Sequence, residues 1–315
     1  TLSVPRLVEL RRCLTTPAPS LLAFQMLAGP SAPARPIQRE TFPRTPRPPN
    51  GVRLTIVTPS FQHRQFLGET IRSVLEQPSV ACDYLVQDGG STDGTAEVLN
   101  QYGPRLHSWA SIPDHGQADA IARAFARTNG RPEDVMAWIN SDDFYLPEAL
   151  ADVAAYFGGH PEIDVVYGHR VVVDEQSREI GRWFLPAHDA DVLRLNDFIP
   201  QETMFWRRRI WDKVGGIDTS FKFAMDWDLL LRFQAAGASI VRVPYFLACF
   251  RVHPAQKTSA QIGSVGQNEI DAVRLRTFGR AISPTELESD RRLIRYLRKS
   301  AWIEFLWRRF SIRHR

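Results

Sequence analysis

The sequence lacks the features that usually stabilise secreted or membrane-spanning proteins. Only three of its 315 residues are cysteine, and Cys13, Cys82 and Cys249 match neither a CxxC pair nor a metal-ligand spacing. An odd number of isolated cysteines argues against a disulfide framework and suits a reducing compartment, so we expect a cytoplasmic protein. No apolar run approaches the roughly 18 to 20 residues that span a bilayer; Leu21–Ala28 and Tyr245–Phe250 are far shorter.

The chain also lacks a general excess of one charge. Its formal net charge is +4, from 39 Lys and Arg and 35 Asp and Glu. Residues 289–315 contain nine Lys or Arg and two Asp or Glu, so this tail carries +7 (9 − 2) and the rest carries −3 (4 − 7). A general nucleic-acid-binding surface is therefore disfavoured, and we expect no nucleic-acid partner.

The first 50 residues show little sign of a packed domain. Arginines precede a short apolar run, as in a signal peptide, but Gln25 interrupts that run, and a short amphipathic helix over 1–29 is the favoured interpretation. Seven prolines between residues 30 and 49 predict a stiff, extended linker over 30–50. We therefore expect a domain boundary near residue 50.

Beyond residue 50, short apolar runs alternate with helical patterns. This alternation predicts βαβ units, an α/β fold and a largely parallel central sheet flanked by helices. After residue 147 the segments 163–173 and 179–185 suit an antiparallel pair, which predicts a mixed extension of the same sheet. Helices are expected over about 64–77, 93–101, 117–127, 147–157 and 225–237, and strands over Leu54–Val57, Tyr84–Gln87, Leu106–Ile112 and Val135–Ile139.

Polar residues follow each of the first four expected strands. Because ligands of open parallel sheets bind beyond the C-terminal strand ends, these residues should converge on one edge. Considered alone, the second stretch is best explained as a capped strand-to-helix turn, and the fourth is equally consistent with an Asx turn. The four stretches are Thr58-Pro-Ser-Phe-Gln-His63, Asp88-Gly-Gly-Ser-Thr-Asp-Gly94, Pro113-Asp-His-Gly-Gln-Ala-Asp119 and Asn140-Ser-Asp-Asp143.

Two further carboxylates begin a later helix, in AMDWDLLLR at residues 224–232. Asp226 and Asp228 are two residues apart, so they diverge around the helix axis. One can face a crevice while the other caps the helix or pairs with Arg232 at the i+4 position. A structural role as a first-turn acid favoured by the helix dipole fits Asp228 better.

Six separated segments occur in order between residues 52 and 258: TIVTPSFQHRQFLGETIRSVLEQ, VQDGGSTDGT, PDHGQADAI, WINSDD, MDWDLLLR and FRVH. In this order and spacing they resemble the family 2 glycosyltransferases with the GT-A fold. The resemblance implies a Rossmann-like GT-A catalytic domain over 51–258 and a helical, basic extension over 259–315. It further implies transfer of a sugar from a nucleotide diphosphate-sugar to an acceptor hydroxyl on a growing glycan or glycolipid, as in the synthesis of bacterial surface polysaccharides.

The resemblance also implies roles for individual residues. Asp226 takes the place of the catalytic base, and Asn140-Ser-Asp142 takes the place of the DXD metal motif. Asp142 is then expected to hold Mg²⁺ or Mn²⁺, with His253 beside the pyrophosphate as a second ligand. The expected donor nucleotide contacts are Pro59, Ser60, Phe61, Asp88, Asp114, Gly116, Asp119, Asn140 and Ser141, and further donor or acceptor contacts are Asp143, Gln201, Glu202, Trp227 and Arg251.

Several of these residues have structural alternatives. Gln201 and Glu202 fit the start of a strand as well as they fit an acceptor site, and Trp227 is more readily a core residue than a sugar platform. A lone His such as His253 is often a structural hydrogen-bonding group, but the neighbouring Arg251 makes a role on the phosphate side equally good.

The chemistry of sugar transfer needs carboxylates in two places. A divalent cation held by hard oxygen ligands neutralises the leaving pyrophosphate, and a base on the other side of the sugar takes the proton of the acceptor hydroxyl. Asn140 replaces the first Asp of the usual triplet, and Met225 replaces the Glu that often precedes the base. Because Asp142 and Asp226 are both retained, we expect a metal-dependent, inverting transferase.

Two other functions remain alternatives. A sugar-1-phosphate nucleotidyltransferase needs a glycine-rich basic loop after its first strand, and Thr58–His63 contains no glycine. A non-catalytic module that binds a nucleotide sugar or a glycan is disfavoured, because it would have no need to retain both Asp142 and Asp226.

The C-terminal tail combines arginines with apolar residues at helical spacing. Leu293, Leu297, Ala301 and Phe305 recur every four residues, which predicts a basic amphipathic helix. Such a helix could lie on the anionic inner face of the cytoplasmic membrane, near a lipid-linked acceptor. A helix packed on the catalytic domain, with solvated arginines, is the slightly favoured alternative.

Overall fold

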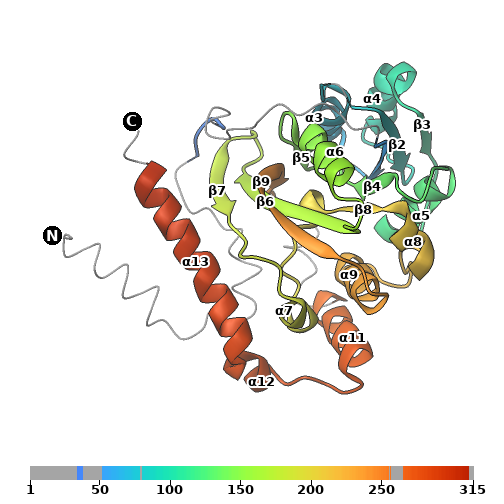
Figure 1. Cartoon of the computed structure of the whole chain (residues 1–315). Coiled ribbons are helices and arrows are strands. Elements are labelled where there is room, and N and C mark those ends of the chain that lie inside the picture. The colour runs from blue at the N-terminus through green and yellow to red at the C-terminus, as the bar shows by residue number, and fades with distance from the viewer. Residues whose placement is uncertain (1–33, 38–51, 79, 255, 257–264, 312–315) are drawn as a thin grey trace.

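A nine-stranded sheet organises the part of the chain that the computed structural model describes, residues 34–37, 52–78, 80–254, 256 and 265–311 (Figure 1). The strand order is β3-β2-β1-β4-β8-β6-β9-β5, with β7 paired to β6. The strands are β1 (Leu54–Ser60), β2 (Cys82–Asp88), β3 (Ser108–Ser111), β4 (Val135–Trp138), β5 (Phe144–Tyr145), β6 (Val165–Val173), β7 (Glu179–Trp183), β8 (Phe205–Arg207) and β9 (Ile240–Arg251).

Helices connect the strands and pack on the sheet through apolar side chains. In α3, for example, Phe66, Leu67, Ile71 and Val74 are buried at the i, i+4 and i+3 spacing of one helix face. The helices are α3 (Arg64–Leu75), α4 (Thr95–Tyr102), α5 (Gln117–Ala126), α6 (Ala149–Gly159), α7 (Ala190–Leu195), α8 (Arg208–Val214), α9 (Met225–Ala235), α11 (Gln267–Phe278), α12 (Pro284–Ser289) and α13 (Arg291–Ser311), with 3₁₀ turns η3 (Gly103–Arg105) and η4 (Gln201–Thr203).

The sheet has a parallel half and a mixed half, as expected from the sequence. β3, β2, β1 and β4 are parallel to one another. In the mixed half, β8 runs antiparallel to β4 and β6, and β6 pairs antiparallel with β7 and parallel with β9. The fold is therefore a parallel Rossmann-like sheet with a mixed extension.

Element boundaries differ from the expected ones at a few positions. The helix expected from residue 147 begins at Ala149, because Glu148 adopts a left-handed backbone with φ of 65° at its N-terminus. The strand expected over 106–112 is shorter, because Leu106 follows the η3 turn and pairing starts at Ser108. Gly237, expected to end the helix over 225–237, has a φ of 84° just beyond the last turn of α9.

Segments near both chain ends contact β7. The helix expected over 1–29 and most of the linker expected over 30–50 lie outside the described residues. Arg35 is described, and it forms an isolated antiparallel bridge with Glu179 as well as a 2.6 Å ion pair. At the other end, α13 packs against β7 and α7, and Leu293, Tyr296 and Leu297 are buried (Figure 1). No helix among the described residues is both long enough and apolar enough to cross a bilayer.

One buried arginine ties the centre of the sheet to the end of α6. Arg207, at the end of β8, is 2% exposed and donates to four backbone carbonyls, those of Glu133, Phe157, His160 and Ile163, at 2.7–2.9 Å. Buried carbonyl groups need partners, so this side chain replaces several backbone hydrogen bonds at once.

We therefore expect Arg207→Met to lower the free energy of unfolding by about 3 kcal/mol, because it removes four hydrogen bonds from a charged, buried donor to backbone carbonyls. Urea denaturation of the full chain measures the change. Arg105→Met, at an exposed position of η3, is the matched control and should change stability by less than about 0.5 kcal/mol. Equal effects of the two substitutions would contradict the structural role given to Arg207.

Candidate active site

The C-terminal ends of the parallel strands lie side by side and bring the expected polar stretches together. Ser60 is paired in register with Asp88, and Asp88 with Ser111. The pairing continues past the strand ends, where Gly89 N donates to Ser60 O at 2.9 Å and Ile112 N donates to Asp88 O at 3.0 Å. The convergence expected at this edge is therefore present.

Asp88 organises the loop that follows β2. Its side chain is fully buried and accepts hydrogen bonds from Gly90 N, Ser91 N, Ser91 Oγ and Ser111 Oγ at 2.5–3.1 Å. In this conformation the carboxylate shapes the loop from within. Its expected contact with the nucleoside remains a prediction.

The expected donor residues between 113 and 119 form a tight turn before α5. Asp114 Oδ1 accepts from Gly116 N at 2.8 Å, and Asp119 Oδ2 accepts from His115 N at 2.9 Å. Gly116 has a φ of 113°, which L-residues with a Cβ avoid, so glycine is needed at this turn. Arg123 of α5 pairs with Asp119 at 2.7 Å and also donates to Pro113 O at 3.0 Å, which fixes the turn on α5.

The C-terminal end of β1 carries one polar group and one apolar group that could contact a ligand. Ser60 is 4% exposed, and its hydroxyl has no hydrogen-bond partner among the described residues. Phe61 follows it and is 59% exposed, and Ile112 after β3 is 49% exposed. A buried hydroxyl without a partner, next to exposed apolar side chains, suits a ligand with both polar and planar groups.

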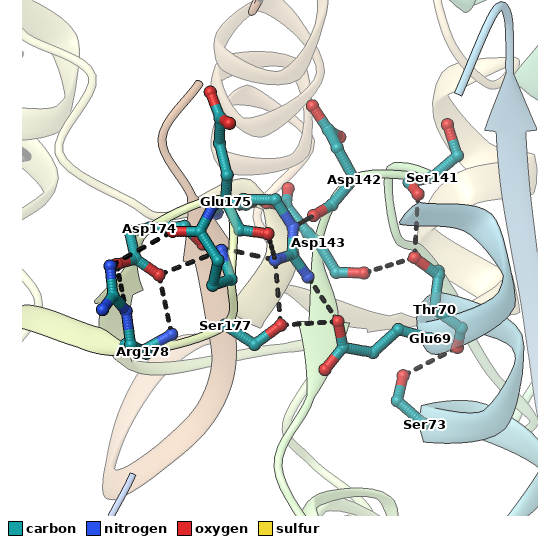
Figure 2. Close-up of polar contacts among 12 residues, drawn as sticks. Glu69, Thr70, Ser73, Ser141, Asp142, Asp143, Asp174, Glu175, Ser177 and Arg178 are labelled. Atoms are coloured by element: carbon teal, nitrogen blue, oxygen red, sulfur yellow. Dashed lines mark hydrogen bonds and ion pairs between the residues drawn. The ribbon is translucent and has the colours of Figure 1, made fainter. Parts of the chain in front are cut away.

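The Asn140–Asp143 loop is fixed from several sides. Figure 2 shows Ser141 and Asp143 contacting Thr70 of α3, whereas the side chain of Asp142 points away from it. The Thr70 hydroxyl lies 2.9 Å from Ser141 O and 2.7 Å from Asp143 O. Gln117 Nε2 at the start of α5 donates to Asn140 Oδ1 at 2.6 Å. The loop is thus held by two helices as well as by β4.

Asp142 and Asp143 have different environments. Asp143 is 1% exposed and its Oδ1 accepts from Arg251 N at 2.9 Å. Burial, reinforced by the charges of Asp142 and Glu202, raises the pKa of the Asp143 carboxyl well above its usual range. Asp142 instead directs Oδ2 at His253 Nε2, 3.0 Å away. Asp142 is therefore the available carboxylate of the loop.

A third residue joins Asp142 and His253 in a compact cluster. One potential ligand atom from each of His63, Asp142 and His253 lies within 4.8 Å of the other two. His253 is 5% exposed and its ring lies 4.8 Å from the ring of Phe66. The cluster thus rests on an apolar base formed by α3.

Local backbone geometry aims His63 at the cluster. Gln62 adopts a left-handed conformation with φ of 56°, and its N–H donates to Ser91 Oγ at 2.7 Å. After this turn, His63 Nδ1 lies 2.8 Å from Ser141 Oγ. Burial lowers the pKa of the His63 imidazole from its ordinary value of 6.5, so the ring is neutral at pH 7.

The donor chemistry of this cluster fits a divalent metal ion. Neutral imidazoles and an ionised carboxylate are the protonation states that metal ligands need. When bound, such an ion would neutralise charge on a phosphate group at the sheet edge. Asp142 and His253 are buried and His63 is half-buried, so the cluster lies at the border of the core.

The expected base lies at the start of α9. Asp226 is half-buried and its Oδ1 accepts from Trp227 N at 2.9 Å. Burial, followed by the charge of Asp226, raises the pKa of Asp197 well above its usual range. Asp228 points elsewhere and pairs with Arg232 at 2.7 Å, which is the i+4 pair expected from the sequence.

The expected donor or acceptor contacts Gln201, Glu202 and Trp227 are buried and bonded within the protein. Glu202 is 1% exposed and forms a two-pronged ion pair with Arg170 at 2.6 and 2.7 Å. Gln201 Nε2 donates to Trp138 O at 2.8 Å. Trp227 is 1% exposed and donates to Leu193 O at 2.7 Å, which agrees with its interpretation as a core residue.

Three residues at the site were not singled out from the sequence: His63, Gln117 and Asp197. His63 and Gln117 lie within stretches expected at the strand ends, but no spacing or repeat distinguishes them from their neighbours. Asp197 precedes the FIPQET segment, and nothing local in the sequence connects it with Asp226.

Comparison with known sequences gives a consistent result. Residues 55–216, just over half of the 315 residues, match the family model described as Glycosyl transferase family 2. A PGL/p-HBAD biosynthesis glycosyltransferase of Mycobacterium bovis is 28% identical over 192 residues, which cover 60% of this chain and 72% of the relative. The O-antigen biosynthesis protein RfbC of Myxococcus xanthus is 29% identical over 246 residues, 76% of this chain and 19% of that protein.

Solved structures share the fold at low sequence identity. S. aureus TarS 1-349, crystallised with UDP-GlcNAc, has a TM-score of 0.59 at 16% identity, with 75% of this chain and 69% of that chain covered. The mannosyltransferase PcManGT of Pyrobaculum calidifontis, in complex with GDP-Man and Mn²⁺, has a TM-score of 0.55 at 15% identity, with 95% and 84% covered. The chain therefore belongs to glycosyl transferase family 2, and it is a glycosyltransferase with the GT-A fold.

Proposed function

We propose that this enzyme transfers a sugar from a nucleotide diphosphate-sugar to an acceptor hydroxyl, with the help of a divalent metal ion and with inversion at the anomeric carbon. The observation that carries the proposal is the arrangement of two separate acidic groups. Asp142 lies in a metal-type cluster with His63 and His253 at the strand edge, whereas Asp226 lies on a different element, at the start of α9.

The cluster of His63, Asp142 and His253 is the proposed metal site. An ion held there would neutralise the two phosphates of the leaving nucleotide. The residues before α5 and after β1 would then surround the nucleoside, with the unpaired Ser60 hydroxyl as a polar contact and exposed Phe61 as an apolar one.

Asp226 is the proposed general base. Burial, and then the charge of Asp226, raises the pKa of the Asp197 carboxyl well above its usual range, so Asp197 is easily protonated and is the weaker candidate for a base. An ionised carboxylate accepts the proton of the acceptor hydroxyl as that oxygen attacks the sugar.

The donor and acceptor classes follow from what related proteins bind and make. The named relatives are a PGL/p-HBAD biosynthesis glycosyltransferase and an O-antigen biosynthesis protein. Of the two similar structures, one contains UDP-GlcNAc and the other contains GDP-Man and Mn²⁺. We infer a nucleotide diphosphate-sugar donor, Mg²⁺ or Mn²⁺ as the ion, and a glycan or lipid-linked acceptor of a bacterial cell envelope.

The outward face of α13 supports a peripheral membrane contact at the inner face of the cytoplasmic membrane. Arg291, Arg295, Arg298, Lys299 and Trp302 are exposed and fall on one side of the helix, opposite the buried Leu293 side. Within the described chain, these four cationic side chains have no ion-pair partner. A cationic face with one exposed Trp is complementary to an anionic lipid surface.

Asp226→Asn should reduce sugar transfer on the order of 10³-fold, because it removes the proton acceptor. Nucleotide-sugar binding, measured by calorimetry, should change by less than about twofold, since Asp226 lies on a different element from the metal cluster. Asp212→Asn, an exposed carboxylate of α8, is the control for loss of charge. A wild-type chain that binds the nucleotide sugar without turnover would favour the non-catalytic alternative.

The anomeric configuration of the product should be opposite to that of the donor sugar. A single base and direct attack by the acceptor give one displacement, and one displacement inverts the carbon. Proton NMR of the purified product measures the coupling constant of the anomeric proton. Retained configuration would require a second displacement and would contradict the single-base proposal.

Charge reversal on α13 should release the protein from anionic vesicles. Arg295→Glu combined with Arg298→Glu is expected to weaken co-sedimentation with phosphatidylglycerol vesicles at least about tenfold, since each basic residue near such a surface contributes about 1 kcal/mol. Removing α13 by truncation after residue 288 would expose the surface against which Leu293 packs. Charge reversal avoids this and is therefore the better test. The control is Arg105→Glu with Lys222→Glu, at exposed positions of η3 and the loop before α9. Equal sedimentation of both double variants would contradict the contact.

A further inference from the structure

A cavity of about 340 Å³ lies between α7, α9 and α11, away from the candidate active site. These three helices contact one another, and α7 also contacts α13 (Figure 1). Asp228, Leu231 and Ala235 line the cavity, and their i, i+3 and i+7 spacing places them on one face of α9. Asp226 precedes Asp228 by two residues, which is about 200° around the helix axis. The cavity therefore lies behind the helix that carries the proposed base.

Positive charge exceeds negative charge in the wall of this cavity. Among the described residues, Arg194, Arg232 and Arg276 line it together with one carboxylate, which gives an excess of +2 (3 − 1). That carboxylate, of Asp228, is shared by Arg232 Nε at 2.7 Å and Arg276 Nη1 at 2.6 Å. Arg276 also contacts Asp218, which lies outside the cavity wall, at 3.1 Å. The wall thus has more cationic charge than its own carboxylate neutralises.

Arg194 at the end of α7 is the cation without an opposite charge. Its guanidinium lies over the ring of Phe278, 4.7 Å from the ring centroid, and it forms no ion pair with any carboxylate in the described part of the chain. The aromatic contact restrains the guanidinium plane. Its N–H groups remain available to an incoming hydrogen-bond acceptor.

Two buried polar atoms of α9 also lack partners. Arg232 Nη2 and Gln234 Oε1 are buried without a hydrogen-bond partner among the described residues, and both side chains line the cavity. Other atoms of these side chains are occupied, since Arg232 Nη1 donates to Gly216 O at 2.6 Å and Gln234 Nε2 donates to Ala190 O at 3.2 Å. Buried polar groups are normally hydrogen-bonded. One free donor and one free acceptor therefore indicate a ligand that both accepts and donates a hydrogen bond.

We propose that this cavity binds a phosphate monoester whose organic part carries a hydroxyl group. A phosphate monoester has a charge of about −1.5 to −2 at pH 7, which matches the excess charge of the wall. Its three terminal oxygens can accept from guanidinium groups on three helices, and its hydroxyl would donate to Gln234 Oε1. The cavity volume lies within the roughly 300 to 1,000 Å³ of small-molecule sites. Leu231 and Val273 provide an apolar wall for the organic part.

Two sources would supply this chemistry: a soluble sugar or polyol phosphate, or the headgroup of a membrane lipid. The helix that carries Arg194 packs against α13, whose exposed face is the proposed membrane contact. A lipid differs from a soluble ester by its acyl chain, so binding of the same phosphate with and without an acyl chain distinguishes the two sources.

The test is a calorimetric titration of the full-length protein, without divalent ions or nucleotide, with glycerol 1-phosphate and with hexanoyl lysophosphatidic acid. Glycerol 1-phosphate should bind saturably at one site. Arg194→Gln should weaken this binding at least about tenfold, because it removes a charge-assisted hydrogen bond. Arg105→Gln, at an exposed position of η3, is the matched control and should change it less than about twofold. Asp142→Asn should also leave it unchanged, which separates the cavity from the candidate active site.

Absence of saturable glycerol 1-phosphate binding in the wild-type protein would overturn the inference, and this result does not depend on whether a variant folds. Unchanged affinity in a folded Arg194→Gln protein would place the phosphate elsewhere and would also overturn it. When binding meets these expectations, at least about tenfold tighter binding of the acylated compound identifies a lipid headgroup as the source, and equal binding identifies a soluble ester. Sugar transfer is not needed for any of these measurements, so the inference and the proposed function fail separately.

Discussion

The buried guanidinium of Arg251 is the interaction on which the geometry of the candidate site depends. This side chain at the end of β9 is 1% exposed, and its Nε donates to Asp142 O at 2.8 Å. Its Nη2 pairs with Glu69 of α3 at 2.7 Å, and its Nη1 donates to Ser177 Oγ in the turn between β6 and β7 at 2.9 Å. One cation thus connects the last strand β9, the Asn140–Asp143 loop, helix α3 and the β6–β7 hairpin. Because a buried charge without partners is costly, these groups hold one another in place.

The Arg251 contacts help to explain why Asp142 and Asp226 lie on separate elements. The loop after β4 is drawn towards β9 and α3, which places Asp142 beside His253 and His63. Asp226 begins α9, whose Trp227 is anchored to Leu193 at the end of α7. The proposed metal ligand and the proposed base are therefore attached to different parts of the sheet. Under the proposed function, the sugar donor would lie between a cation that stabilises its leaving group and a carboxylate that activates its acceptor.

Much of this could be predicted from the sequence, because the signals are local. Apolar runs at regular intervals indicated the parallel sheet, and the polar stretch after each run indicated the edge at which ligands bind. The i+4 pair of Asp228 with Arg232 followed from helical spacing alone. The bonds that complete the site join residues far apart in the chain, and no period marks them. His63 reaches a loop that begins at Asn140, and the charge of Asp226 helps to raise the pKa of Asp197 although the two residues are 29 positions apart.

The central claim is that His63, Asp142 and His253 hold one divalent ion at the edge where the parallel strands end. Anomalous diffraction from crystals of the enzyme grown with Mn²⁺ and a nucleoside diphosphate tests it most directly. The account predicts one manganese peak within about 2.0–2.3 Å of ligand atoms from all three residues, with phosphate oxygens on its open side. A manganese peak bound by other residues, or a nucleotide bound at this edge with no manganese between its phosphates and Asp142, would contradict it.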